Sequence, residues 1–146
     1  MLDSKIIEYL KSKNAWFENT DIDCEDYKDI LINLGVDINS DFGRFYNYAE
    51  EHAGGFSSRD FELWQICWVY ENGDYLEINE ALIKDLNLSK DYYVLSEFEG
   101  ESAYFYNQKE NTVHLIGYAE DGISTLKKWD SFNEFLIWYF ELWYRS

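Results

Sequence analysis

Residues 92–118, YYVLSEFEGESAYFYNQKENTVHLIGY, decide the predicted fold. β-branched and aromatic residues dominate three runs, 92–98, 103–107 and 112–118, so each run predicts a short strand. A turn centred on Gly100 separates the first two runs, and the polar loop 107–111, NQKEN, has a normal length for a hairpin connection. The stretch therefore predicts an antiparallel three-stranded meander.

Helical patterns precede the meander. Apolar residues at helical spacing predict a helix over residues 2–13, with Asp3 or Ser4 as its cap, and a second helix over about 22–34 that ends at Gly35. A third helix is predicted over residues 41–52, opened by Asn39 or Ser40 as its cap. The N-terminal part of the chain, residues 1–37, is therefore expected to be helical.

The segment between these helices and the meander predicts further strands. Residues 63–70, LWQICWVY, are apolar on both faces apart from Gln65, which indicates an inner strand with Cys67 as a small buried side chain. Residues 75–88 predict a short strand and then a short helix that Asn79 caps, and residues 123–129 predict a last strand. The expected fold is a single α+β domain over residues 1–146. Its sheet is mixed, mainly antiparallel, of about five to six strands, with the N-terminal helices and a C-terminal helix packed on it.

The C-terminal helix has the clearest signal. Ser131 and Glu134 have the spacing of a capping box, and apolar residues then recur every three or four positions. Trp138 and Leu142 widen the apolar stripe beyond what one sheet face needs. They are expected either to pack against the N-terminal helices, the interpretation we prefer, or to form an exposed patch for a partner or a second copy.

The charge balance limits the partners. The chain of 146 residues has 12 basic and 29 acidic residues, a net charge of −17, which disfavours direct contact with nucleic-acid phosphates or anionic lipid. A basic protein partner fits better, and the 20% aromatic residues suit recognition as well as packing. Alternatively, the charge only keeps an aromatic-rich protein in solution.

Targeting and cysteine signals point to the cytoplasm. No basic segment followed by an apolar run opens the chain, and the longest apolar run, FLIWYF, is too short to span a bilayer. Cys24 and Cys67 form no disulfide framework and have no metal-ligand spacing, so two free thiols are expected. We expect a cytoplasmic monomer or weak homodimer that does not contact membranes.

No motif predicts catalysis, a cofactor or a metal. Acids alternate in DIDCEDYKD, residues 21–29, but Asp26 stands where a calcium loop needs glycine and Ile32 where it needs a bidentate acid. A charged helix start explains this pattern better. His52 and His114 are isolated, and no phosphate loop or nucleophile motif is found, so we expect no enzyme.

Several motifs resemble those of the SUKH superfamily. A strand ending in acids is followed by AYFYN, then by a hairpin to VHLIGY, and later by a tryptophan and SFNEFL. The stretch VDINSDFGRFYNYAEEHAGG resembles the signature start of that domain, although Asn39 stands where proline is usual. The resemblance covers residues 38–142.

This resemblance implies an α+β fold and a function. The superfamily consists mostly of bacterial immunity proteins against polymorphic toxins, together with fungal cell-wall-assembly regulators. It implies that the chain binds and neutralises a toxin domain of the nuclease class by occupying its basic active-site cleft. The alternative is a regulatory scaffold that binds several cellular proteins. Surfaces diverge within the superfamily, so site residues do not transfer one by one.

Acidic residues at three turns are the candidate partner-binding surface. The first turn lies between residues 71 and 80, the second surrounds Gly100, and the third follows residue 119. The last two groups are expected to share one edge of the sheet, although acids at turns are also common simply because turns are solvated. The candidate residues are Glu71, Asp74, Glu77, Glu97, Glu99, Glu101, Tyr104, Tyr106, Glu120 and Asp121.

Overall fold

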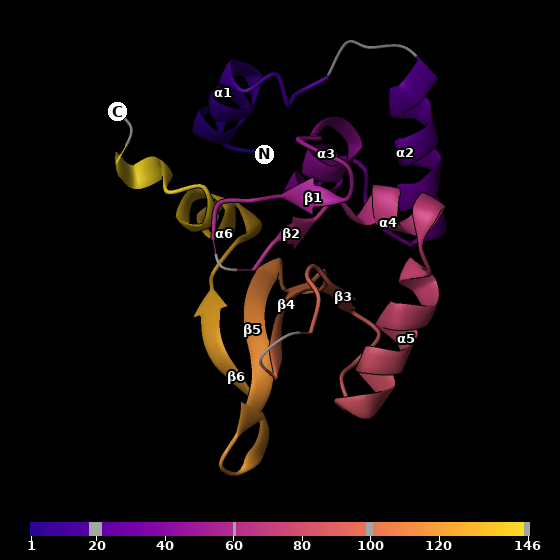
Figure 1. Cartoon of the computed structure of the whole chain (residues 1–146), viewed down its shortest axis with the longest axis vertical. Coiled ribbons are helices and arrows are strands. Elements are labelled where there is room, and N and C mark those ends of the chain that lie inside the picture. The colour runs from indigo at the N-terminus through magenta and orange to yellow at the C-terminus, as the bar shows by residue number, and fades with distance from the viewer. Residues whose placement is uncertain (18–21, 60, 99–100, 145–146) are drawn as a thin grey trace.

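The computed structural model describes residues 1–17, 22–59, 61–98 and 101–144, and it has an α+β fold, as predicted (Figure 1). Most of the helices lie on one side of a four-stranded antiparallel sheet, and a separate two-stranded sheet lies between them (Figure 1). The helices are α1 Ser4–Ser12, α2 Ile22–Asn33, α3 Asp41–Tyr48, α4 Ile66–Asn72, α5 Tyr75–Asp85, α6 Phe132–Tyr139 and the 3-10 helix Leu142–Tyr144. The strands are β1 Gly55–Phe56, β2 Leu63–Trp64, β3 Tyr92–Val94, β4 Ser102–Asn107, β5 Thr112–Ala119 and β6 Gly122–Trp129.

The predicted meander is confirmed. Its strands pair in the order β3-β4-β5-β6, each antiparallel to the next. The first strand is shorter than predicted and ends at Val94. The N–H of Leu95 still donates to the carbonyl of Tyr104 at 2.8 Å, but the N–H of Tyr104 then donates to the side-chain Oγ of Ser96 at 3.0 Å, so a side chain replaces the backbone partner there. Since β1 and β2 form their own sheet, the main sheet has four strands rather than five or six, and every strand pair described is antiparallel.

The predicted inner strand over residues 63–70 is wrong. Only Leu63 and Trp64 form a strand, and a helix, α4, begins at Ile66 after the extended residue Gln65. Gln65 is fully buried and caps this helix, because its Oε1 accepts a hydrogen bond from the backbone N–H of Cys67 at 2.9 Å. Short apolar runs fit a buried helix as well as a buried strand, so hydrophobicity alone did not distinguish the two.

The short strand and short helix predicted over residues 75–88 are instead a single helix, α5. Asn79, predicted as a cap, lies inside this helix and binds the edge of the main sheet instead. Its Oδ1 accepts a hydrogen bond from the backbone N–H of Val94 at 2.8 Å, and its Nδ2 donates to the carbonyl of Tyr92 at 3.3 Å. The amide therefore acts as a side-chain extension of the β3 ladder.

Most of the predicted helix ends are confirmed. Asp3 caps α1, Ser40 caps α3 and Ser131 caps α6, each by accepting a hydrogen bond from a backbone N–H of its helix. Gly35 follows α2 with φ +81°, a conformation that glycine adopts without strain. Helix α3 is shorter than predicted and ends at Tyr48, because the chain then extends to form a β-bridge with the residues after α1. Within the calcium-like pattern, the side chains of residues 21–26, Cys24 among them, lie outside those that the structure describes, and the remaining residues 27–29 lie within α2.

An aromatic core fills the space between the main sheet and the helices. Phe42 of α3 stacks on Tyr106 of β4 with ring centroids 4.0 Å apart, and Phe132 of α6 contacts both rings. Helix α1 packs on α6 and on the 3-10 helix, where Leu142 is buried. The preferred prediction for Leu142 is therefore confirmed, while Trp138 is half-buried.

We expect Gln65 to be the most sensitive polar residue of the core. The substitution Gln65→Met keeps the side-chain volume but leaves the carbonyls of Tyr46 and Ala49 and the N–H of Cys67 without their bonds to the amide. The free energy of unfolding should fall by about 2–4 kcal/mol in urea denaturation. The control is Gln108→Met, whose amide bonds the carbonyl of Gly35 near solvent and should cost less than about 1 kcal/mol. Equal losses would contradict this interpretation of Gln65.

Two fully buried tyrosines offer a matched pair. The hydroxyl of Tyr75 donates to the carbonyl of Val94 at 2.8 Å, whereas the hydroxyl of Tyr46 is buried without a hydrogen-bond partner among the described residues. Burial raises the pKa of both phenols well above the ordinary value. The ionisation of these phenols therefore leaves stability unchanged below pH about 10, and stability falls as the pH rises further, because the unfolded chain loses these protons before the folded chain does.

The same substitution, tyrosine to phenylalanine, should change stability differently at the two positions. Tyr75→Phe should destabilise the protein by about 1–2 kcal/mol, whereas Tyr46→Phe should be neutral or stabilising by up to about 1 kcal/mol. Both changes should also reduce the loss of stability between neutral pH and pH 11. Urea denaturation at the two pH values measures both quantities, and a destabilised Tyr46→Phe variant would contradict the assignment.

Candidate partner-binding surface

His114 and Cys67 lie in buried surroundings. His114 is buried in β5, where Thr112 and Thr125 contact its two ring nitrogens at 2.9 and 3.3 Å, and burial together with Lys128 lowers its pKa. Burial raises the pKa of the Cys67 thiol well above its ordinary value, which disfavours the nucleophilic thiolate. In the described part of the chain, no three His, Cys, Asp or Glu side chains are placed to hold a metal ion.

His52 lies beyond the end of α3 rather than in its last turn, and it sits next to a serine and an acid. Its Nε2 is 3.1 Å from the Oγ of Ser57 and 3.5 Å from a carboxylate oxygen of Glu62. A hydrolytic triad places the acid on the other ring nitrogen, which here faces the carbonyl of Ala53 at 3.4 Å. The cluster is therefore an exposed polar contact without triad geometry.

The predicted surface role of Tyr104 and Tyr106 is wrong. They are only 4% and 2% exposed, because both point from β4 into the aromatic core. Tyr104 packs edge-on against Phe135 with ring centroids 5.1 Å apart. The consecutive aromatic residues of β4 reflect burial of both faces of this central strand rather than recognition.

The second and third acidic groups lie at the same end of the main sheet, as predicted. The carbonyl of Glu101 accepts a hydrogen bond from the N–H of Tyr118 at 3.1 Å, and the β5–β6 hairpin continues from there to its tip at Glu120 and Asp121 (Figure 1). All these residues are exposed, and so is Glu97. We call Glu97, Glu101, Tyr118, Glu120 and Asp121 the acidic sheet end; Glu99 lies outside the described residues.

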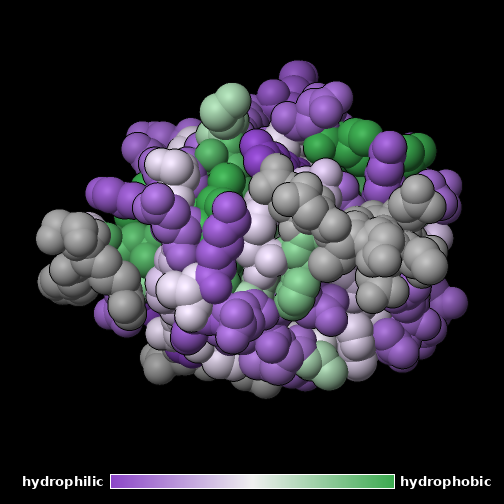
Figure 2. Space-filling model, turned by 90° about the horizontal axis from the view of Figure 1, so that it is seen from above, coloured by the Kyte–Doolittle hydropathy of each residue, from purple (hydrophilic) through white to green (hydrophobic). Residues whose placement is uncertain are grey.

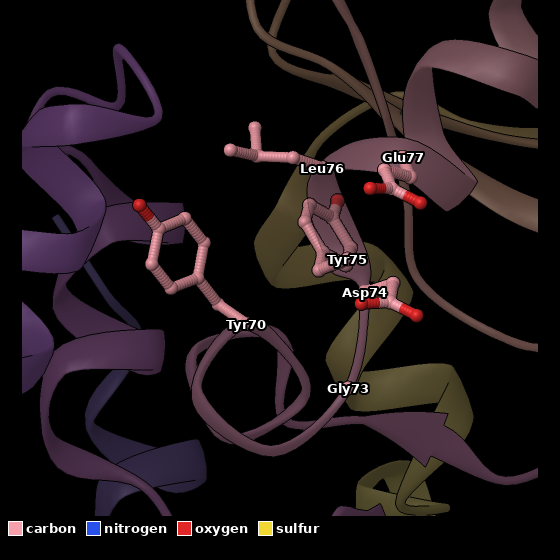
Figure 3. Close-up of a pocket in the computed structure, with 6 residues that line it drawn as sticks. All are labelled: Tyr70, Gly73, Asp74, Tyr75, Leu76 and Glu77. Atoms are coloured by element: carbon pink, nitrogen blue, oxygen red, sulfur yellow. The ribbon is translucent and has the colours of Figure 1, made fainter.

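The first acidic group borders a pocket at the junction of α4 and α5 (Figure 3). The pocket has a volume of about 200 Å³ and is lined by Tyr70, Gly73, Asp74, Tyr75, Leu76 and Glu77. Asp74 and Glu77 thus line the same pocket, Asp74 from the N-cap position of α5 and Glu77 from its first turn. Glu71, by contrast, lies on α4, and its charge contributes to the raised pKa of Tyr27 on α2. Figure 1 places this junction beside α2, away from the hairpin of the acidic sheet end.

A cluster of tryptophans and cations was not predicted. The ring of Trp138 has the guanidinium carbon of Arg59 at 4.1 Å and the Nζ of Lys127 at 4.6 Å, and Trp129 lies 4.8 Å from it. Arg59 also donates to the carbonyl of Trp138 at 2.6 Å, near the end of α6. These contacts shield Trp138, and no periodicity in the sequence indicated that Arg59 would lie there.

Large hydrophobic side chains are dispersed over the surface. The face seen in Figure 2 is mostly hydrophilic, and its hydrophobic areas are small and separated. The exposed large hydrophobic residues belong to different elements: Met1, Phe17, Ile32, Leu76, Tyr118, Leu126 and Trp143. Leu76 and Tyr118 lie beside acidic residues, in the pocket and at the acidic sheet end. None of the helices in the described ranges is both long and apolar enough to cross a membrane.

No family model matches the chain, and neither a curated protein nor a solved structure matches it. The resemblance to the SUKH superfamily therefore stays a prediction that rests on the quoted motifs alone.

Proposed function

We propose that the protein is an immunity protein, which binds a basic toxin domain with nuclease activity and neutralises it by covering its active-site cleft. The observation that carries this proposal is the placement of exposed carboxylates at two fixed positions, the acidic sheet end and the pocket between α4 and α5. Both positions include an exposed apolar residue, Tyr118 in the first and Leu76 in the second. An acidic rim around apolar anchors suits a basic partner.

Electrostatics supports fast and selective association. A net charge of −17 steers a basic domain towards the chain, and carboxylates held by secondary structure resemble the phosphates that a nuclease cleft binds. The hairpin of the acidic sheet end extends beyond the rest of the sheet, which suits insertion into a cleft (Figure 1). The proposal assigns no chemical step to the protein, since occupation of the cleft is sufficient. It places the protein in the cytoplasm, where thiols such as Cys67 stay reduced.

The Trp138 cluster favours a second candidate function, a regulatory scaffold. Arg59 and Lys127 make this surface cationic, unlike both acidic positions, so it suits a partner of different chemistry. A scaffold would bind several cellular proteins with modest affinity. An immunity protein would bind one toxin domain tightly and with a defined stoichiometry.

Co-expression tests the proposal directly. The partner to test is any toxin C-terminal domain that a gene beside this one encodes, and the readouts are bacterial growth and nucleic-acid cleavage by the purified toxin domain. We expect growth to be rescued and cleavage to be inhibited at one-to-one stoichiometry. Loss of growth together with the absence of a complex by size-exclusion chromatography would overturn the immunity proposal.

Charge reversal at the acidic sheet end should weaken this complex. The triple variant Glu101→Lys, Glu120→Lys and Asp121→Lys should lower the association rate at least tenfold at low salt and flatten its salt dependence. The control reverses the exposed residues Glu8, Asp85 and Glu110, which gives the same net charge at other places. Equal effects of the two triple variants in stopped-flow binding would assign the effect to net charge and remove the acidic sheet end from the interface.

A further inference from the structure

We infer that the pocket between α4 and α5 accepts an arginine side chain of the basic partner. This inference rests on the proposed function and assigns the partner chemistry that one of its two acidic positions recognises. The pocket has an apolar and an acidic end: Tyr70 and Leu76 lie on one side, and the carboxylates of Asp74 and Glu77 lie on the other (Figure 3). An arginine side chain has the same division, with an apolar stem and a charged head.

The two carboxylates are available for a cation. Asp74 occupies the capping position of α5, but its side chain accepts no hydrogen bond from the helix. Neither Asp74 nor Glu77 joins an ion pair within the ranges that the structure describes, and both are exposed. A partner cation would therefore find both acids without displacing an internal contact.

The apolar end supplies what an acidic turn alone lacks. Leu76 is 46% exposed, a large fraction for a leucine at the edge of a pocket, and the half-buried ring of Tyr70 faces it. The methylene groups of an arginine stem would cover this apolar surface and remove it from water. Acidic residues that are exposed only for solubility need no apolar surface beside them. The combination of two carboxylates with the apolar surface of Tyr70 and Leu76 therefore indicates a pocket for a side chain of the partner.

The pocket is formed before a partner binds. Tyr75, between its two ends, is buried and anchored to the main sheet by its bond to the carbonyl of Val94. Gly73 closes α4 through a 2.7 Å bond from its N–H to the carbonyl of Val69, and a side chain there would approach that carbonyl at 3.1 Å. Ordering of the pocket therefore costs little on binding, which favours recognition of a single side chain.

Arginine suits the pocket better than lysine. The guanidinium is planar and carries five N–H donors in a fixed fork, so it can bond two carboxylates at once, whereas an ammonium is a compact and strongly hydrated charge. Citrulline has nearly the same shape as arginine but no charge. A comparison of the three side chains therefore separates charge from shape.

An NMR titration of the full chain tests the pocket. The probes are the N-acetyl, N′-methylamide derivatives of arginine, lysine and citrulline, followed through backbone amide shifts. We expect arginine to shift the amides of residues 70–77 in a saturable manner in the millimolar range, lysine to bind several-fold more weakly, and citrulline to cause no shift. Shifts spread over acidic residues of the whole chain, or equal shifts from arginine and lysine, would overturn the inference.

Matched variants locate the binding. The double variant Asp74→Asn and Glu77→Gln should weaken arginine binding at least tenfold, and Tyr70→Ala should weaken it several-fold through loss of the apolar wall. The control, Glu80→Gln and Asp85→Asn, removes the same charge from α5 outside the pocket and should leave the affinity unchanged. If the control weakens binding as much as the pocket variant, the inference fails.

Co-expression with the toxin domain distinguishes this inference from the proposed function. If the wild-type chain protects the cells and the double pocket variant does not, both stand. If the double variant protects as well as the wild type and binds the toxin domain equally tightly, the partner does not use the pocket and only the inference fails. If the wild type does not protect but binds the arginine probe at residues 70–77, the immunity proposal fails while the pocket stands as an arginine site.

Discussion

The side-chain amide of Gln65 is the interaction on which the arrangement of the helices depends. Its Nε2 donates to the carbonyls of Tyr46 and Ala49 at the end of α3, and its Oε1 accepts from the N–H of Cys67 at the start of α4. A fully buried amide is tolerated only when it is bonded, because the interior offers no water. These three hydrogen bonds of Gln65 therefore connect the end of α3 to the start of α4 and determine the direction in which α4 leads to α5.

The hydrogen bonds of Gln65 also position the candidate surface. Helix α4 carries Tyr70, and the short turn at Gly73 leads directly into the acidic first turn of α5. Tyr75 and Asn79 then fasten α5 to the edge strand β3. These hydrogen bonds connect α5, which carries the carboxylates of the pocket, to the main sheet, and the acidic hairpin belongs to the same sheet. Rigid presentation of charge is what inhibition by occupation requires, since flexible acids would lose affinity through their ordering.

Local patterns predicted much of the fold, and long-range packing explains the failures. The meander, the caps at Ser40 and Ser131 and the stop at Gly35 depend on neighbouring residues and were found in the sequence. The run around Gln65 was misassigned because its helix is set by contacts with the end of α3, distant in sequence. At the candidate surface, the sequence indicated the acids but not the pocket wall at Tyr70. The sequence also predicted Tyr104 and Tyr106 in the surface, because their position near acidic turns does not reveal that both faces of β4 are covered.

The central claim is that two acidic positions, connected through the hydrogen bonds of α5 to β3 and through the main sheet, bind a basic toxin domain. Hydrogen–deuterium exchange of the chain alone and in complex with that domain tests it most directly. The account predicts that the complex slows exchange at residues 70–77 and at residues 101 and 118–121, while α1 and the 3-10 helix Leu142–Tyr144 exchange as in the free chain. Slower exchange confined to α1 and the C-terminal helices, with both acidic positions unchanged, would contradict it.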